Sequence, residues 1–159
     1  MQSTPATPPS ATPSLPPQLP TPVAWLGYGG LLPFVALAMV GWWAPGNPLW
    51  TTALLGYGAV ILSFIGALHW GLAMALPGLD EAERTRLFIW SVVPCLLAWP
   101  ALLVPSQMGA TLLIAGFAAH LWQDHRLARK ATLPAWYLPL RRRLTVTACV
   151  CLALGAAVA

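Results

Sequence analysis

Five long apolar stretches follow one another after the first 22 residues of the chain. They cover residues 24–43, 49–76, 87–104, 107–123 and 144–159, and none contains Asp, Glu, Lys or Arg. An uncharged run of about 20 residues matches the hydrocarbon thickness of a bilayer. Such a run must satisfy its backbone groups internally, which favours a helix. The pattern predicts an all-α integral membrane bundle of five transmembrane helices, or of four if the short last stretch lies at the interface.

Residues 1–22 differ in composition from everything that follows. They contain eight prolines, several Ser, Thr and Gln residues, and no charged side chain. A segment of this kind cannot bury enough apolar surface to fold. We therefore predict a disordered, Pro-rich tail over residues 1–22 and a helical transmembrane domain over residues 23–159.

Charged side chains occur only in two of the connections between apolar stretches. All eight basic residues lie within residues 84–86 and 126–143, which a five-span topology places on one side of the membrane. The positive-inside rule makes that side cytoplasmic, so we expect a cytoplasmic N-terminal tail and a periplasmic C-terminus. Asp80 and Glu83 have the spacing of a helix cap, which predicts that the third helix begins near Glu81. Basic residues that fix topology give no reason to expect a nucleic-acid partner.

Polar side chains within the apolar stretches gather in the cytoplasmic half of the predicted bundle. His120 and Asp124 lie one helical turn apart, and His69 occupies the same half. Polar groups in membrane helices usually face the bundle interior. We predict a polar pocket formed by His69, Ser91, His120, Gln123 and Asp124.

The two histidines of this pocket allow two interpretations. They can simply form hydrogen bonds between helices. Alternatively, His69 and His120 can ligate a haem iron or bind a quinone head group. No motif assigns a cofactor, a metal or a catalytic residue, and none is predicted.

Two further groups of residues favour contacts with helices and with lipid. Small residues recur every four positions in the second stretch and predict a helix-packing stripe: Ala59, Ser63, Ala67 and Gly71. The connection before the last stretch mixes basic and aromatic side chains, which favours contact with anionic head groups. The predicted lipid-contacting loop consists of Arg126, Arg129, Lys130, Trp136, Tyr137, Arg141, Arg142 and Arg143.

Several strings resemble one protein family. They are LGYGGLLPF at 26–34, ILSFIGALHWG at 61–71, WSVVP at 90–94, and Trp136-Tyr137 followed by Leu140-Arg141 and Leu144-Thr145. These strings resemble the bacterial members of the transmembrane protein 69-like family, a membrane domain of unknown function. The resemblance implies a multi-pass protein of the bacterial inner (cytoplasmic) membrane and names no catalytic residue.

The sequence thus favours a non-enzymatic binding or assembly protein. Its expected partners are membrane lipids, another membrane protein complex or a second copy of the chain. The alternative is a haem- or quinone-binding protein that uses His69 and His120, and a small transporter is a third hypothesis.

Overall fold

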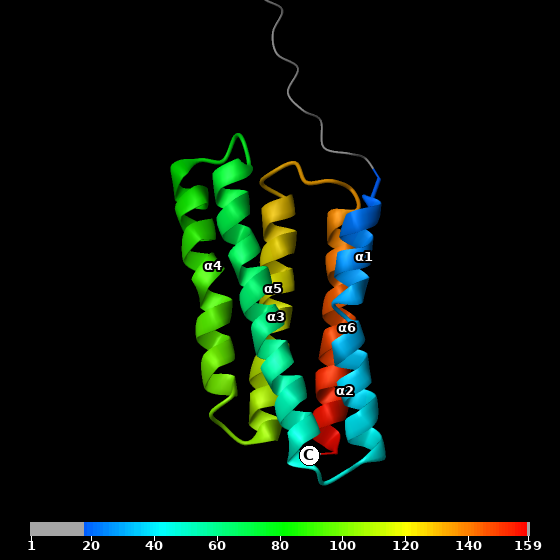
Figure 1. The fold of residues 1–159 in the computed structure, drawn as a ribbon. Coiled ribbons are helices and arrows are strands. Elements are labelled where there is room, and N and C mark those ends of the chain that lie inside the picture. Colours follow the sequence, from blue (N-terminus) through cyan, green and yellow to red (C-terminus); the bar gives the residue numbers. More distant parts are fainter. Residues whose placement is uncertain (1–17, 159) are drawn as a thin grey trace, which may run out of the picture.

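The computed structural model describes residues 18–158, and every regular element in that range is a helix. The helices are α1 (Thr21–Gly29), α2 (Leu32–Trp43), α3 (Pro48–Ala75), α4 (Glu81–Ala101), α5 (Ser106–Ala128) and α6 (Tyr137–Ala157) (Figure 1). The predicted all-α architecture is confirmed. Most of the predicted tail lies outside the described residues, and Thr21 and Pro22, assigned to it above, belong to α1.

The first predicted span is divided into two helices, α1 and α2, that follow one another along the same side of the bundle (Figure 1). Pro33 at the start of α2 has no backbone N–H, so regular helical hydrogen bonding is interrupted near this point. The hydroxyl of Tyr57 on α3 donates to the carbonyl of Gly30 at 2.8 Å. A side chain of α3 thus satisfies a backbone group at the break and ties it to the bundle.

Helix direction alternates from α2 to α6, so the connections gather at two ends of the bundle (Figure 1). The start of α1, the α3–α4 connection and the α5–α6 connection share one end. All eight basic and four acidic residues of the chain fall within 80–86 and 124–143, at or near this end, which we call the charged end. Asp80 caps α4 there, accepting the Glu83 N–H at 2.7 Å, which confirms the predicted helix start at Glu81.

Helix α3 packs closely against α4 at Gly66. A Cβ added at Gly66 would lie 2.9 Å from both Pro94 Cγ and the carbonyl oxygen of Ser91. Real Cβ atoms do not approach other atoms this closely, so this contact requires glycine. Helix α3 also packs against α2, α5 and α6, so it lies at the centre of the bundle.

The small-residue stripe predicted on α3 is not a single packing surface within the bundle. Ala59 is buried and Ser63 is half-buried, but Ala67 and Gly71 are exposed. A repeat of four residues advances about 400° around a helix, so it drifts by about 40° at each step. Over the three steps from Ala59 to Gly71 the drift is about 120°, which carries the later residues out of the interface.

The outer surface of the bundle is strongly apolar. Six tryptophans are at least half exposed: Trp25, Trp42, Trp43, Trp70, Trp99 and Trp122. The segment Thr21–Trp43, which contains α1 and α2, and helix α3 are long and apolar enough to cross a membrane by length and composition. Helices α4, α5 and α6 carry charged residues in the turns near the charged end, and they are not among the helices that pass that test.

Candidate functional site

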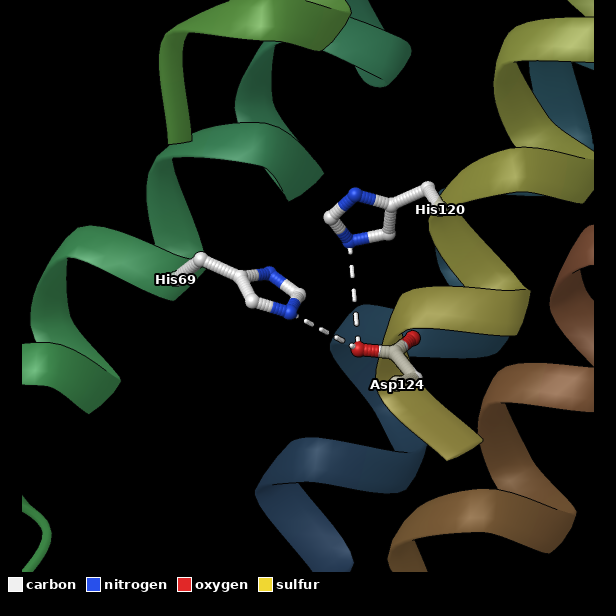
Figure 2. A group of neighbouring side chains, drawn as sticks. All are labelled: His69, His120 and Asp124. Carbon is white, nitrogen blue, oxygen red and sulfur yellow. Dashed lines mark ion pairs between the residues drawn. The ribbon is translucent and has the colours of Figure 1, made fainter. Parts of the chain in front are cut away.

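A cluster of buried polar side chains joins three helices near the charged end. It consists of His69 on α3, His120 and Asp124 on α5, and Arg141 on α6. His69, His120 and Asp124 are 0% exposed, and both imidazole rings point toward the same carboxylate (Figure 2). The structure therefore brings together three of the five residues predicted for the polar pocket, and we call the four residues the polar cluster.

Asp124 is the centre of the polar cluster. Its Oδ2 accepts a charge-assisted hydrogen bond from Arg141 Nε at 2.8 Å, and its Oδ1 accepts one from the Tyr137 hydroxyl at 3.0 Å. The Nε2 atoms of His69 and His120 lie 3.6 and 3.9 Å from Oδ1, beyond hydrogen-bond distance. The negative charge of Asp124 is thus balanced by Arg141, and both carboxylate oxygens already have a donor.

His120 is held by a tryptophan as well as by its own helix. The indole N–H of Trp90 on α4 donates to Nδ1 of His120 at 3.2 Å. An indole nitrogen can only donate, so Nδ1 of His120 is an acceptor and carries no proton. The imidazole is therefore neutral, with its proton on Nε2.

The other two residues of the predicted pocket are buried but lie in different surroundings. The hydroxyl of Ser91 donates to the carbonyl of Phe88 on its own helix at 2.7 Å. Gln123, next to Asp124 on α5, is 3% exposed. Neither residue has a hydrogen bond to the polar cluster among the contacts of residues 18–158.

The prediction for Arg141 as a lipid-contacting residue is wrong. Arg141 is 6% exposed and pairs with Asp124 inside the bundle, whereas Arg142 and Arg143 are exposed. Successive helical residues point about 100° apart, so only one member of the arginine run can face the interior. Tyr137 is also drawn inward by its hydrogen bond to Asp124.

The remaining residues of the predicted loop lie at the surface of the charged end or close to it. Arg126 and Lys130 approach Glu83 of α4 at 3.9 and 3.8 Å, and Arg129 is exposed. The guanidinium of Arg126 also lies over the ring of Trp122, 5.9 Å from its centre. These contacts tie the end of α5 to α4 and leave basic groups at the surface.

The geometry of the polar cluster tests the cofactors that two histidines suggest. Ligand atoms of His69, His120 and Asp124 lie within 4.8 Å of one another, close enough to surround a metal ion. A divalent ion would nevertheless add two positive charges to a buried cluster that Arg141 already neutralises, at a cost of several kcal/mol. Ligation through Nε2 of His120 would also require its proton to move to Nδ1, which would remove the hydrogen bond from Trp90.

An axial haem site fits less well. Histidines that ligate one haem iron lie on opposite faces of the porphyrin. The rings of His69 and His120 instead contact each other edge to face, with centroids 4.6 Å apart and planes at 83°. No porphyrin plane fits between rings in this contact.

Four buried nitrogen atoms of the polar cluster lack a hydrogen-bond partner among residues 18–158. Besides two ring nitrogens of His69, which also lies close to the backbone of Ile65, they are Nε2 of His120 and Nη2 of Arg141. Buried donors and acceptors are nearly always satisfied, because each one left unpaired costs about 1–3 kcal/mol. The polar cluster can therefore donate further hydrogen bonds, from Nη2 of Arg141 and Nε2 of His120, to a molecule that reaches it.

A pocket of about 320 Å³ lies beside the polar cluster. It is enclosed by α1, α2, α3 and α6, with one wall residue from α5, and Arg141, Tyr137 and Thr145 form its polar part. We call it the lateral pocket. Its other lining residues are Val23, Leu26, Gly27, Gly30, Leu31, Phe34, Ile61, Phe64, Ile65, Leu68, Phe117, Trp136, Leu140, Leu144 and Ala148. Among these, the sequence assigned a role only to Arg141, Tyr137 and Trp136, as residues that contact lipid.

Comparison with known proteins agrees with the family suggested by the short strings. Residues 19–157 match the family described as "Protein of unknown function (DUF3429)". The chain is 38% identical over 136 residues to Transmembrane protein 69 of Xenopus tropicalis, in an alignment that covers 81% of this chain and 51% of the relative. The chain thus spans about half the length of that relative. No solved structure matches the chain.

Proposed function

The chain belongs to the DUF3429 family, and from that premise we propose that it is a multi-pass membrane protein that binds a lipid-soluble small molecule. The molecule lies in the lateral pocket with its polar group at Arg141. The proposal rests on one observation: Arg141, whose buried Nη2 has no hydrogen-bond partner among residues 18–158, is one of the residues that line an otherwise apolar pocket.

Membrane placement is supported by the distribution of charged and aromatic side chains. We propose five crossings, formed by α1 with α2 together and by α3, α4, α5 and α6. Because the basic residues gather at the charged end, that end faces the cytoplasm of a bacterium and carries the N-terminal tail, while the C-terminus is periplasmic. Exposed tryptophans near both ends fit the interfacial belts of membrane proteins: Trp25, Trp122, Trp42, Trp43 and Trp99.

The lateral pocket opens toward the surface that this placement turns to lipid. Phe64 and Leu68 at its edge are 62% and 38% exposed, whereas Phe34 and Phe117 at its inner wall are 1% and 2% exposed. A molecule dissolved in the bilayer can therefore enter sideways without crossing the charged end. Because such a molecule leaves lipid and not water, packing and the polar contact must supply the affinity, and the hydrophobic effect adds little.

The polar part of the lateral pocket provides orientation. Arg141 is held in place by Asp124, so its Nη2 is fixed in position before any ligand arrives. A preorganised donor loses little entropy when it binds an acceptor. An acceptor atom that meets Nη2 also removes the cost of an unsatisfied buried donor.

Binding is a better account of the polar cluster than catalysis. A general base must offer a free acceptor to the reacting proton. Each oxygen of Asp124 already accepts a hydrogen bond, from Arg141 or Tyr137, and Nδ1 of His120 accepts one from Trp90, which leaves His69 as the residue of the polar cluster with a ring nitrogen free to accept. The groups left free suit recognition of a polar head.

The proposal is tested by extracting and identifying the small molecules that co-purify with the protein from native membranes. Gly27 lines the lateral pocket, and a Cβ there would lie 3.4 Å from Leu144 Cδ1, so Gly27→Leu fills the pocket. Gly29→Leu is the matched control, because a Cβ at Gly29 meets nothing within 4 Å. We expect a molecule in stoichiometric amount with wild type and Gly29→Leu and its loss with Gly27→Leu. Equal recovery from all three proteins would contradict the proposal.

A further inference from the structure

The charge of the polar cluster restricts the kind of head group that the lateral pocket accepts. Asp124 and Arg141 carry opposite charges and are joined at 2.8 Å in a fully buried pair. His120 is neutral because its Nδ1 accepts the Trp90 N–H. An anionic head at Arg141 would leave a net buried negative charge next to Asp124, and a cationic head would meet Arg141 itself. Both arrangements carry the cost of an uncompensated buried charge.

We infer that the occupant of the lateral pocket is a neutral, carbonyl-bearing ring with one apolar tail, that is, a lipid-soluble quinone. The inference rests on the proposed function and names the ligand class of the same pocket. A quinone carbonyl is an uncharged acceptor, which suits the unpartnered Nη2 of Arg141 and leaves the charge balance of the polar cluster unchanged. The proposal concerns binding alone.

The shape of the lateral pocket favours a single ring over a two-chain lipid. Its volume of about 320 Å³ lies at the small end of ligand pockets, which run from about 300 to 1,000 Å³. The inner wall is aromatic, with Phe34 and Phe117 in edge-to-face contact at a centroid distance of 6.2 Å. Aromatic side chains form favourable contacts with a flat ring.

The exit for a tail lies on the opposite side of the lateral pocket. Phe64 and Leu68 of α3 are exposed there, and α1 on the facing side exposes Val23 and Leu26. A single isoprenoid or alkyl chain can pass between these side chains into lipid. The two acyl chains of a phospholipid would require a wider opening and a larger cavity.

The test uses the purified full-length protein in lipid nanodiscs and two tryptophan-quenching probes of similar length. Decylubiquinone has a neutral quinone head, and 2-bromodecanoate has an anionic one. Trp136 lines the lateral pocket and serves as the nearby fluorophore. We expect saturable quenching by decylubiquinone in wild type and in Gly29→Leu, and none in Gly27→Leu. Leu68→Phe, at the exposed mouth, is the second blocking variant if Gly27→Leu does not fold, and it adds no tryptophan to the assay.

A third variant tests the polar contact itself. Arg141→Lys keeps the positive charge beside Asp124 but removes the planar fork that supplies Nη2. Loss of one hydrogen bond predicts an affinity for decylubiquinone about tenfold weaker than that of wild type. An unchanged affinity would overturn the assignment of the carbonyl to Arg141.

The two proposals fail in different ways. Saturable binding of 2-bromodecanoate that Gly27→Leu abolishes, without binding of decylubiquinone, overturns the quinone and leaves the proposed function standing. If neither probe binds specifically but a co-purified molecule is still lost in Gly27→Leu, the quinone is overturned and the proposed function again stands. Absence of all three effects overturns the proposed function as well.

Discussion

Replacement of Arg141 by Met removes the charge partner of Asp124, the buried carboxylate of the polar cluster. Asp124 is 0% exposed, and its 2.8 Å bond to Arg141 is the contact that neutralises it. Breaking a buried ion pair from one side costs about 3–5 kcal/mol, because the remaining charge is left uncompensated. Tyr137 still donates to Asp124 in this variant, so we expect the lower part of that range, about 3 kcal/mol of unfolding free energy.

The double variant Asp124→Leu with Arg141→Met separates the cost of a lost partner from the value of the pair. Replacing a whole buried ion pair by apolar residues of similar volume is often neutral or stabilising. We therefore expect the double variant to lie within about 1 kcal/mol of wild type, with a coupling energy of at least about 2 kcal/mol between the sites. Arg142→Met is the matched control, since Arg142 is exposed and should change stability by less than about 0.5 kcal/mol.

The assay is reversible unfolding in mixed micelles of increasing SDS fraction, followed by helical circular dichroism. The single and double variants are compared with wild type at the same protein concentration. A double variant as unstable as Arg141→Met would show that Asp124 and Arg141 do not act as a buried pair. An Arg141→Met protein as stable as Arg142→Met would refute the burial of the guanidinium.

Three further predictions address packing, hydrogen bonding and topology. Gly66→Ala should lower the unfolding free energy by about 1–3 kcal/mol in the same SDS assay, because its Cβ would lie 2.9 Å from Pro94 Cγ. The control is Gly71→Ala, at an exposed position of the same helix, which should be neutral or slightly stabilising. Trp90→Phe removes the N–H that fixes His120 and should lower the unfolding free energy by about 1 kcal/mol. In ¹⁵N NMR spectra of labelled histidine, His120 should no longer favour the Nε2–H tautomer, and an unchanged spectrum would contradict the assignment. Alkaline phosphatase fused after residue 103 should be active and after residue 131 inactive, and the reverse pattern would overturn the proposed orientation.

The helices themselves follow closely from the apolar pattern. Uncharged stretches mark most of α3 to α6, and the cap at Asp80 fixes the start of α4. The break between α1 and α2 follows from Pro33, which removes a backbone donor from the first apolar stretch. The composition of a stretch determines that it is helical, whereas a break depends on a single residue.

The polar cluster was predictable in part because polar groups in an apolar helix must face the interior. His69, His120 and Asp124 do meet in the interior, and Ser91 and Gln123 are equally buried, but their different surroundings depend on local geometry. Spacing alone does not distinguish these outcomes.

Arg141 was missed because a run of three arginines was treated as one surface. Helical spacing distinguishes Arg141 from Arg142 and Arg143. Arg141 precedes Thr145 by four residues and Ala148 by seven, so the three share a face, and all are buried. A buried Asp124 also requires a nearby cation, which points to the one arginine on that face. The lateral pocket forms between segments that are far apart in the sequence, and no spacing or composition in the sequence indicates it.

The most direct test of the account is an experimental structure of the protein purified from native membranes without added ligand. The account predicts density in the lateral pocket from a ring-and-tail molecule that accepts a hydrogen bond from Nη2 of Arg141 and is not seen in the Gly27→Leu protein. A pocket closed by the side chains of Phe64 and Leu144 in the wild-type protein would contradict it.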